Sequence, residues 1–174
     1  TASGARGEPR PRDGAARRGT LRLSDPVSTP ATVDDALVDA GSRWHESQPA
    51  PEGEESALTV LPHRALPPGT EPPVEEAFAT DYPNVEDPSA AVVSPETADE
   101  YGTDAYVLSN AAGYAGHAAA FVDAVLSVRR SIPDDTALYC PATATPANVA
   151  TLVYAGVDLV DEKRARARGF EGFY

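Results

Sequence analysis

The second half of the chain alternates short apolar runs with helix-like stretches, and this alternation constrains the fold more than any other feature of the sequence. Continuous apolar runs bounded by turn residues predict strands that are buried on both faces. We predict such strands at residues 90–94, 104–109, 136–140 and 157–160. Helical spacing, or a capping residue before proline, predicts helices at residues 95–101, 115–131 and 146–154. This order of elements is typical of a parallel α/β sheet, either open or closed into a β/α barrel.

The first half of the chain has weaker patterns. We predict a strand at residues 19–23, a short helix from about residue 31 that ends near Gly41, a buried strand at 56–62 and a short helix at 74–82. Residues 1–14 are polar and rich in arginine, glycine and proline, so we expect them to be disordered and the barrel portion to occupy residues 15–174. A complete eight-stranded β/α barrel typically needs about 250 residues. The predicted fold class is therefore α/β, and a barrel of this length would be incomplete, with an open sheet as the alternative.

Acidic residues dominate the composition, with 27 Asp and Glu against 14 Lys and Arg and a formal net charge of −13. Lys163 is the one lysine among these bases. A lysine-poor acidic surface predicts a halophilic protein, because concentrated salt screens its self-repulsion; an ordinary acidic protein is the alternative. No apolar run approaches the roughly 18 residues of a membrane span, and the polar first residues do not resemble a signal peptide. We therefore predict a cytoplasmic protein without a membrane partner.

Positive charge gathers at the end of the chain. Residues 163–174 hold Lys163, Arg164, Arg166 and Arg168 against one acid, whereas residues 23–162 hold four arginines and 24 acids. A basic cluster on an acidic body can bind a phosphate backbone locally. These four side chains are therefore the predicted RNA-binding residues, and compositional bias at a frayed end is the alternative.

Ligands of parallel α/β folds bind beyond the carboxyl ends of the strands, so the residues at those positions are the site candidates. Asp161 ends the last predicted strand and is the candidate catalytic carboxylate, with a helix N-cap or a surface ion pair as the alternative. The predicted substrate-binding residues follow earlier strands and are His63, Arg64, Ser109, Asn110 and Gly113.

Two further residues of this region are expected to have structural rather than catalytic roles. Asp158 lies within a strand and is expected to be a structural hydrogen-bonding partner. Cys140 has no evident base beside it, so a packed thiol is favoured over a nucleophile. As the single cysteine, it also excludes an internal disulfide and a multi-cysteine zinc site within this chain. No metal site is predicted here.

Several segments resemble one enzyme family. "IPDDTALYCPATATPANVATLVYAGVDLVDEKRARARG" resembles the late strands of the tRNA-guanine transglycosylase barrel, and "DAYVLSNAAGYAGH" stands where that family has its Gly-Gly-Leu base-recognition loop. "RDGAARRGTLRLSDPVSTP", "LTVLPHRALPPGT" and "AAVVSPETADEYGTDAYVLS" are similar to the haloarchaeal branch known as archaeosine synthase. The resemblance covers residues 12–169 approximately, as five segments in the same order as in the family. It implies a partial, truncated (β/α) barrel of the TIM type, of the tRNA-guanine transglycosylase kind and incomplete at its C-terminal side.

The resemblance implies tRNA modification in archaeosine biosynthesis. The transglycosylase exchanges a guanine of the tRNA D-loop for 7-cyano-7-deazaguanine, and the synthase branch joins the nitrile of that base to an amino-group donor such as lysine. Asp161 matches the transglycosylase nucleophile. The Asp-Ser-Gly-Gly-like motif of the exchange reaction is missing, and "SNAAG" replaces the Gly-Gly-Leu loop. The resemblance therefore implies a tRNA-modifying transferase that adds a donor rather than exchanging a base.

The family's zinc-binding cysteines and C-terminal RNA-binding domain have no counterpart in this sequence. We therefore expect the chain to be a fragment of a longer enzyme, with no cofactor of its own, with zinc in the missing C-terminal part, and inactive alone. The expected partners are tRNA, the amino-group donor, and either a second copy or a partner enzyme of the archaeosine pathway. A non-catalytic tRNA-binding or partner subunit with a degenerate fold is one alternative, and an unrelated β/α-barrel enzyme acting on a phosphorylated metabolite is another.

Overall fold

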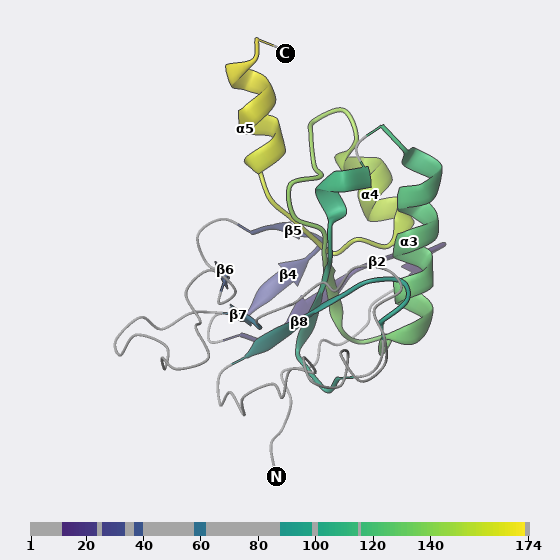
Figure 1. The fold of residues 1–174 in the computed structure, drawn as a ribbon. Coiled ribbons are helices and arrows are strands. Elements are labelled where there is room, and N and C mark those ends of the chain that lie inside the picture. Colours follow the sequence, from purple (N-terminus) through teal and green to yellow (C-terminus); the bar gives the residue numbers. More distant parts are fainter. Residues whose placement is uncertain are drawn as a thin grey trace, which may run out of the picture.

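A seven-stranded parallel sheet forms the centre of the fold (Figure 1). The computed structural model of the chain describes residues 12–23, 26–33, 37–39, 58–61, 88–98, 101–114 and 116–172. The strands of this sheet are β5 (Ala31–Thr32), β6 (Leu37–Asp39), β7 (Leu58–Val60), β8 (Ser89–Val93), β9 (Ala105–Leu108), β10 (Ala137–Tyr139) and β11 (Leu159–Val160). Their order across the sheet is β5-β11-β10-β9-β8-β7-β6. The prediction of a parallel α/β sheet is therefore confirmed.

The order of the strands follows the order of the chain, apart from β5. From β6 to β11 each strand pairs in parallel with the one before it, and β5 pairs in parallel with β11. The two edges of the sheet, β5 and β6, are thus neighbours in the sequence. The closure of the sheet into a TIM-type barrel stays a prediction.

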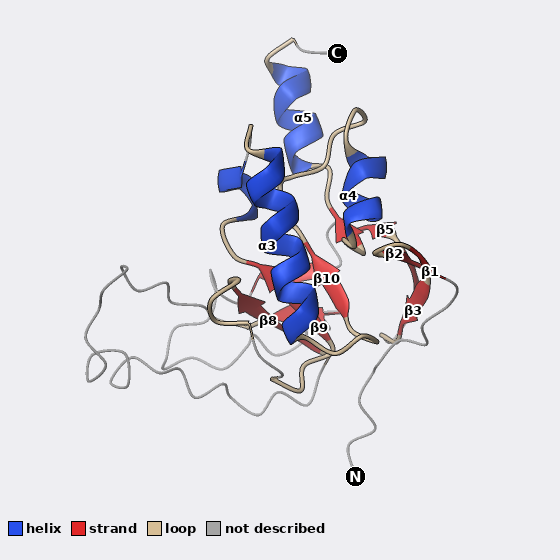
Figure 2. Cartoon of the chain, turned by 90° about the vertical axis from the view of Figure 1, so that its right-hand side faces the viewer, coloured by secondary structure: helices blue, strands red, loops and turns tan. Residues whose placement is uncertain are grey.

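The sheet is buried on both faces, as its continuous apolar strands predicted. Helices α3 (Ala118–Ser131) and α4 (Val149–Ala155) lie on one face (Figure 2). The core there joins Phe121, Val125 and Val128 of α3 to strand residues that include Tyr106 and Leu108. The core of the other face is formed by Leu58, Val60, Ala90, Ala105, Val107, Ala137, Tyr139 and Leu159, together with Leu21 and Val33. Successive side chains along each strand therefore point alternately into two separate cores, one on each face of the sheet.

The two covering helices were predicted well. α3 begins at Ala118 after His117, whose side chain makes no capping hydrogen bond. α4 ends at Gly156, which has φ +104°, the left-handed conformation that glycine adopts most easily at a helix end. A third helix, α5 (Lys163–Phe170), was not predicted. It has no buried residue and extends away from the sheet beyond the end of β11 (Figure 1).

Two predicted helices are wrong. The helix that was to end near Gly41 is replaced by β5 and β6, because parallel pairing with β11 and β7 satisfies this backbone in the sheet. Residues 95–97 form a turn instead of the start of a helix. In that turn the Thr97 N–H donates to the Ser94 Oγ at 3.2 Å, so the predicted N-cap bond forms, but no helix follows it in the described residues. The helix predicted at 74–82 lies outside the described residues.

Two antiparallel hairpins precede the sheet. The first pairs β1 (Arg12–Asp13) with β2 (Ala16–Arg17), and the second pairs β3 (Gly19–Leu21) with β4 (Val27–Thr29). β1 lies inside the segment predicted to be disordered, whose first eleven residues are outside the described part. The first hairpin packs on α4, where a Cβ at Gly14 would stand 3.6 Å from the Tyr154 hydroxyl oxygen.

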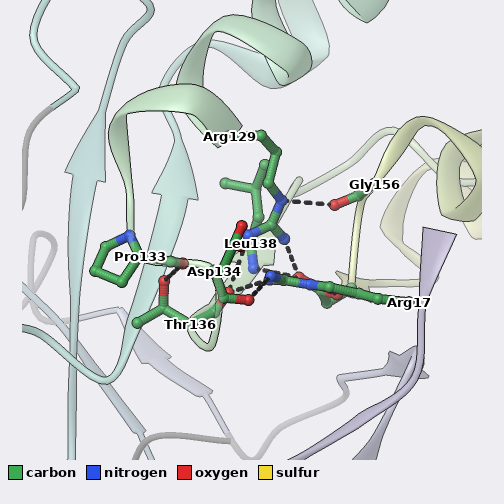
Figure 3. A network of polar contacts seen from close by, with 8 residues as sticks. Arg17, Arg129, Pro133, Asp134, Thr136, Leu138 and Gly156 are labelled. Atoms are coloured by element: carbon green, nitrogen blue, oxygen red, sulfur yellow. Dashed lines mark hydrogen bonds and ion pairs between the residues drawn. The ribbon is translucent and has the colours of Figure 1, made fainter. Parts of the chain in front are cut away.

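A buried ion network fastens this hairpin to the sheet (Figure 3). Arg17 donates to both oxygens of Asp158 at 2.8 and 2.7 Å, and Arg129 of α3 also donates to that carboxylate. The backbone N–H of Leu138 donates to Asp158 at 2.8 Å. Asp158 precedes β11 and is only 2% exposed, so its predicted structural role is supported. The network lies at the amino ends of β10 and β11.

Candidate functional site

Asp161 lies at the carboxyl end of β11 and is buried, with 3% exposure. The Tyr139 hydroxyl of β10 donates to its Oδ2 at 2.6 Å. The N–H of Ala142 donates to both carboxylate oxygens at 3.1 Å, and the N–H of Lys163 donates to Oδ1 at 3.0 Å. These three donors make four contacts, which occupy the roughly four lone-pair sites of a carboxylate. All are neutral groups, and among the described residues no cation forms an ion pair with Asp161.

The loop after β10 is shaped around this carboxylate. Ala142 has φ +53°, in the left-handed region that non-glycine residues rarely adopt. The hydrogen bonds from its N–H to Asp161 compensate a backbone strain of about 1–2 kcal/mol. The Thr143 hydroxyl donates to the Cys140 carbonyl at 2.8 Å and closes the same turn. Asp161 therefore positions both this loop and the start of α5.

Tyr139 is the residue of this arrangement that sequence analysis missed. It pairs with Leu159 across β10 and β11, and its side chain points to the same face as Leu159. Asp161 lies two residues beyond Leu159, where the side-chain direction repeats about 7 Å further along the strand. The long tyrosine side chain spans this step. The register of two neighbouring strands would have been needed to find the pair from the sequence.

The predicted substrate-binding residues after β9 share one tight loop. Ser109 donates its backbone N–H to the Val93 carbonyl at 2.8 Å and follows Val107 on the face where Tyr139 lies. Asn110 has φ +49° and leads into the short helix η1 (Ala111–Tyr114). A Cβ at Gly113 would lie 2.5 Å from the Asn110 Oδ1, so another residue here would displace the Asn110 side chain. The loop lies at the same end of the sheet as Asp161. His63 and Arg64 lie outside the described residues.

The four predicted RNA-binding residues all lie on α5. Lys163, Arg166 and Arg168 are exposed, and Arg164 is half-buried. Arg166 forms an ion pair with Glu162 one turn earlier, with 3.0 Å between Nη2 and Oε2. The helix therefore carries its positive charge away from the acidic body.

Two cavities flank the base of α5. The first, which we call the Asp161 cavity, has a volume of about 360 Å³. Its walls include Thr32, Thr145, Val149, Asp161, Glu162 and Arg166. The second, which we call the inter-helix cavity, has about 240 Å³ and lies between η1, α3, α4 and Arg164 of α5. A smaller cavity of about 20 Å³ adjoins Asp158 at the opposite end of the strands. Of these three cavities, the two larger ones lie at the carboxyl ends of the strands, where ligands of parallel sheets bind.

Cys140 is fully buried beside this site. Burial raises the pKa of its thiol far above the ordinary value, with Asp158 adding to the rise and Arg129 opposing it. The thiol is therefore neutral at physiological pH, which supports a packed thiol rather than a nucleophile.

In the part of the chain that the structure describes, no three His, Cys, Asp or Glu side chains come together as metal ligands. No described helix is long and apolar enough to cross a membrane.

Comparisons with known proteins relate most of the chain to one enzyme. No family model matches. The chain is 61% identical over 163 residues to archaeosine synthase of Haloferax volcanii, and the aligned region covers 94% of this chain and 28% of that protein. It is 33% identical over 190 residues to archaeosine synthase subunit alpha of Methanosarcina acetivorans, and that aligned region covers 94% of this chain and 30% of the relative. These matches confirm the resemblance to archaeosine synthase, and the chain spans less than a third of either relative.

Proposed function

We propose that the chain acts in tRNA modification, as a part of an archaeosine-forming enzyme. The observation that carries this proposal is the 61% identity to archaeosine synthase over 94% of the chain. The substrate we propose is tRNA that carries 7-cyano-7-deazaguanine in its D-loop. The reaction we propose is addition of an amino-group donor, such as lysine, to the nitrile of that base. In it the donor nitrogen bonds to the nitrile carbon while a proton moves to the nitrile nitrogen.

Asp161 is the proposed catalytic residue of this transferase. It faces a cavity of about 360 Å³ at the carboxyl end of the sheet. Of the two acids that line this cavity, Asp161 is the buried one and Glu162 is exposed. To accept a proton from the donor amine, the carboxylate must release one of its present hydrogen bonds. The bond from the Ala142 N–H is the one divided between both oxygens, at 3.1 Å to each, and it is the longest. We propose that the substrate replaces this bond.

The basic face of α5 is the proposed contact for the tRNA backbone. Its exposed cations stand on a helix without buried residues, so they can approach phosphates without unfolding a core. Substituting Arg168 by Ala should weaken tRNA binding and reduce the slope of log K against log salt by nearly 1. An unchanged slope of log K against log salt would contradict a contact between α5 and the tRNA backbone.

The proposed architecture behind this site is a TIM-type barrel. Five residue steps separate Thr32 of β5 from Leu37 of β6, and they span at most about 18 Å. The edges of the sheet must therefore lie close together, as barrel closure requires. A solved structure that leaves β6 on an open edge would contradict this closure.

A non-catalytic tRNA-binding or partner subunit is the second candidate. The saturated hydrogen bonding of Asp161 favours it, since that carboxylate already has a structural role. The name "subunit alpha" of the second relative also agrees with an assembly of several chains. The test is the Asp161→Asn substitution in the whole enzyme. Loss of archaeosine formation with tRNA binding retained supports catalysis, whereas unchanged formation supports the subunit alternative.

The remaining parts of the proposal concern the surroundings of the enzyme. We propose a halophilic, cytoplasmic protein that works with a second copy or with another enzyme of the same pathway. Zinc, if the enzyme binds it, is proposed to lie outside this chain. Metal analysis of the whole enzyme after dialysis against a chelator tests that assignment, and zinc retained by this chain alone would contradict it.

A further inference from the structure

The inter-helix cavity is separate from the Asp161 cavity and has a different composition. It lies at the carboxyl side of β9 and β10, against the helix-covered face of the sheet. Its floor is apolar and includes Leu152 of α4 and Phe121 of α3. Its volume of about 240 Å³ is below the roughly 300–1,000 Å³ of sites for drug-sized ligands. The cavity therefore suits one nucleobase rather than a larger ligand.

An aromatic pair forms one wall. The rings of Tyr114 and Phe121 meet edge to face, with their centroids 6.0 Å apart and an interplanar angle of 73°. This arrangement fixes both rings before a ligand arrives. Aromatic side chains with a fixed orientation are the usual platform on which nucleic-acid bases stack.

Arg164 provides the charge of the cavity. Its side chain is half-buried and makes no hydrogen bond or ion pair with any residue that the structure describes. None of the described residues that line this cavity is acidic, although the chain as a whole carries 27 acids. The Asp161 cavity, by contrast, contains Asp161 and Glu162 next to Arg166. The inter-helix cavity therefore selects an anion where most of this surface repels one.

Polar groups complete the wall opposite the rings. The Asn148 side chain accepts from the Thr145 N–H at 2.7 Å and donates to the Thr143 carbonyl at 3.1 Å, so it is fixed in place. Thr151, one turn along α4, also lines the cavity and is exposed. Within the described part of the chain its hydroxyl has no partner, which leaves it available to the edge of a base.

We propose that the inter-helix cavity binds one unpaired nucleotide of an RNA, with its base against Tyr114 and its phosphate at Arg164. This proposal rests on the proposed function, because it assigns the nucleotide to the tRNA substrate. The nucleotide is distinct from the one that is modified, since the inter-helix cavity and the Asp161 cavity have no lining residue in common. Seating an extruded base here would orient the tRNA for reaction at the other cavity.

The test is titration of the protein with guanosine 5′-monophosphate, followed by calorimetry and by chemical-shift changes. Guanosine, which lacks the phosphate, and inorganic phosphate, which lacks the base, serve as the comparison ligands. We expect the nucleotide to bind more tightly than either, because it meets both the rings and the guanidinium. Arg164→Ala should weaken nucleotide binding about 10-fold or more, the usual effect of losing a hydrogen bond to a charged group.

Arg168→Ala is the matched control, since it removes the same side chain one turn further along α5 and outside the cavity. It should weaken tRNA binding through lost charge and leave mononucleotide binding within about twofold. Thr151→Trp should block the cavity while retaining Arg164, and it should abolish mononucleotide binding. Unchanged circular dichroism confirms that each variant is folded.

The outcomes separate this proposal from the function on which it rests. Equal mononucleotide affinities for the Arg164→Ala and Arg168→Ala proteins would overturn the cavity as a nucleotide site, even if tRNA binds well. Binding of inorganic phosphate as tight as that of the nucleotide would overturn the base-binding part. Tight binding of the nucleotide without binding of tRNA would instead overturn the proposed function.

Discussion

Asp158 and Asp161 stand at opposite ends of β11, three residues apart, and they have opposite surroundings. Both are buried, with 2% and 3% exposure. Asp158 is held by the guanidinium groups of Arg17 and Arg129, whereas Asp161 receives hydrogen bonds from neutral donors only. The cavity beside Asp158 has about 20 Å³, against about 360 Å³ beside Asp161. One end of the strand is built for stability, and the other has room for a ligand.

The contrast shows how the fold divides its charges. At the amino end two cations meet one carboxylate, and burial lowers the pKa of Arg129 to about 10 although Asp158 opposes this effect. Arg129 therefore remains charged at neutral pH, but in a tightly filled network. At the carboxyl end the arginines lie on α5, a helix without buried residues.

The largest effect is expected from Asp158→Asn. This substitution leaves two buried guanidinium groups without their carboxylate, and removing one partner of a buried ion pair typically costs 3–5 kcal/mol, so about that loss is expected in the free energy of unfolding. Chemical denaturation measures it. Asp123→Asn, at an exposed position of α3, is the control and should change stability by less than about 0.5 kcal/mol. Equal effects of the two substitutions would refute the structural role of Asp158.

A smaller loss is expected from Tyr139→Phe. The substitution removes the hydroxyl group that donates the 2.6 Å hydrogen bond to Asp161, so about 1.5–3 kcal/mol of stability should be lost. The loop around Ala142 should also become more accessible to hydrogen exchange. Tyr154→Phe, at an exposed tyrosine, is the control, and its stability should stay within about 0.5 kcal/mol of the original. Full stability of the Tyr139→Phe protein would show that Asp161 does not depend on this donor.

The Cys140 thiol gives a prediction on pH. Its folded pKa is raised, so the folded protein keeps this proton while the unfolded chain loses it near the ordinary value of 9.0. Stability should therefore be unaffected by this group below pH 9 and fall above it, by up to about 1.4 kcal/mol for each pH unit. Cys140→Ala should lose that slope. Rapid alkylation of the folded protein at pH 8 would contradict a buried neutral thiol.

The smallest effect on stability is expected from Arg166→Ala. Its pair with Glu162 is exposed at both side chains and joins residues one helical turn apart, so it contributes no more than about 0.5 kcal/mol. Thermal melts should show almost no change, while tRNA binding weakens. A loss of stability as large as that of Arg17→Ala would contradict the division between a structural and a functional end.

The sequence predicted what local patterns determine. The strands at 89–93, 105–108 and 137–139 follow continuous apolar runs, and Gly156 marks the end of α4. Asp161 was placed correctly at the carboxyl end of its strand, because a run of four apolar or buried residues leads directly to it.

What the sequence did not predict depends on distant contacts. Arg17 and Asp158 are separated by 141 positions, and only the packed fold brings them together. The strands β5 and β6 were taken for a helix because their pairing partners lie far along the chain. α5 was missed because it has no apolar face, and Tyr139 because its role depends on the register of two strands.

The most direct test of the account is the formation of modified tRNA by the whole enzyme that carries Asp161→Asn. Single-turnover assays on tRNA containing 7-cyano-7-deazaguanine would be run beside tRNA-binding measurements. The account predicts a loss of rate of about 10²–10⁴-fold, the usual contribution of a general acid or base, with tRNA affinity nearly unchanged. A rate equal to that of the unsubstituted enzyme, in a protein that is folded and binds tRNA, would contradict the assignment of catalysis to this end of β11.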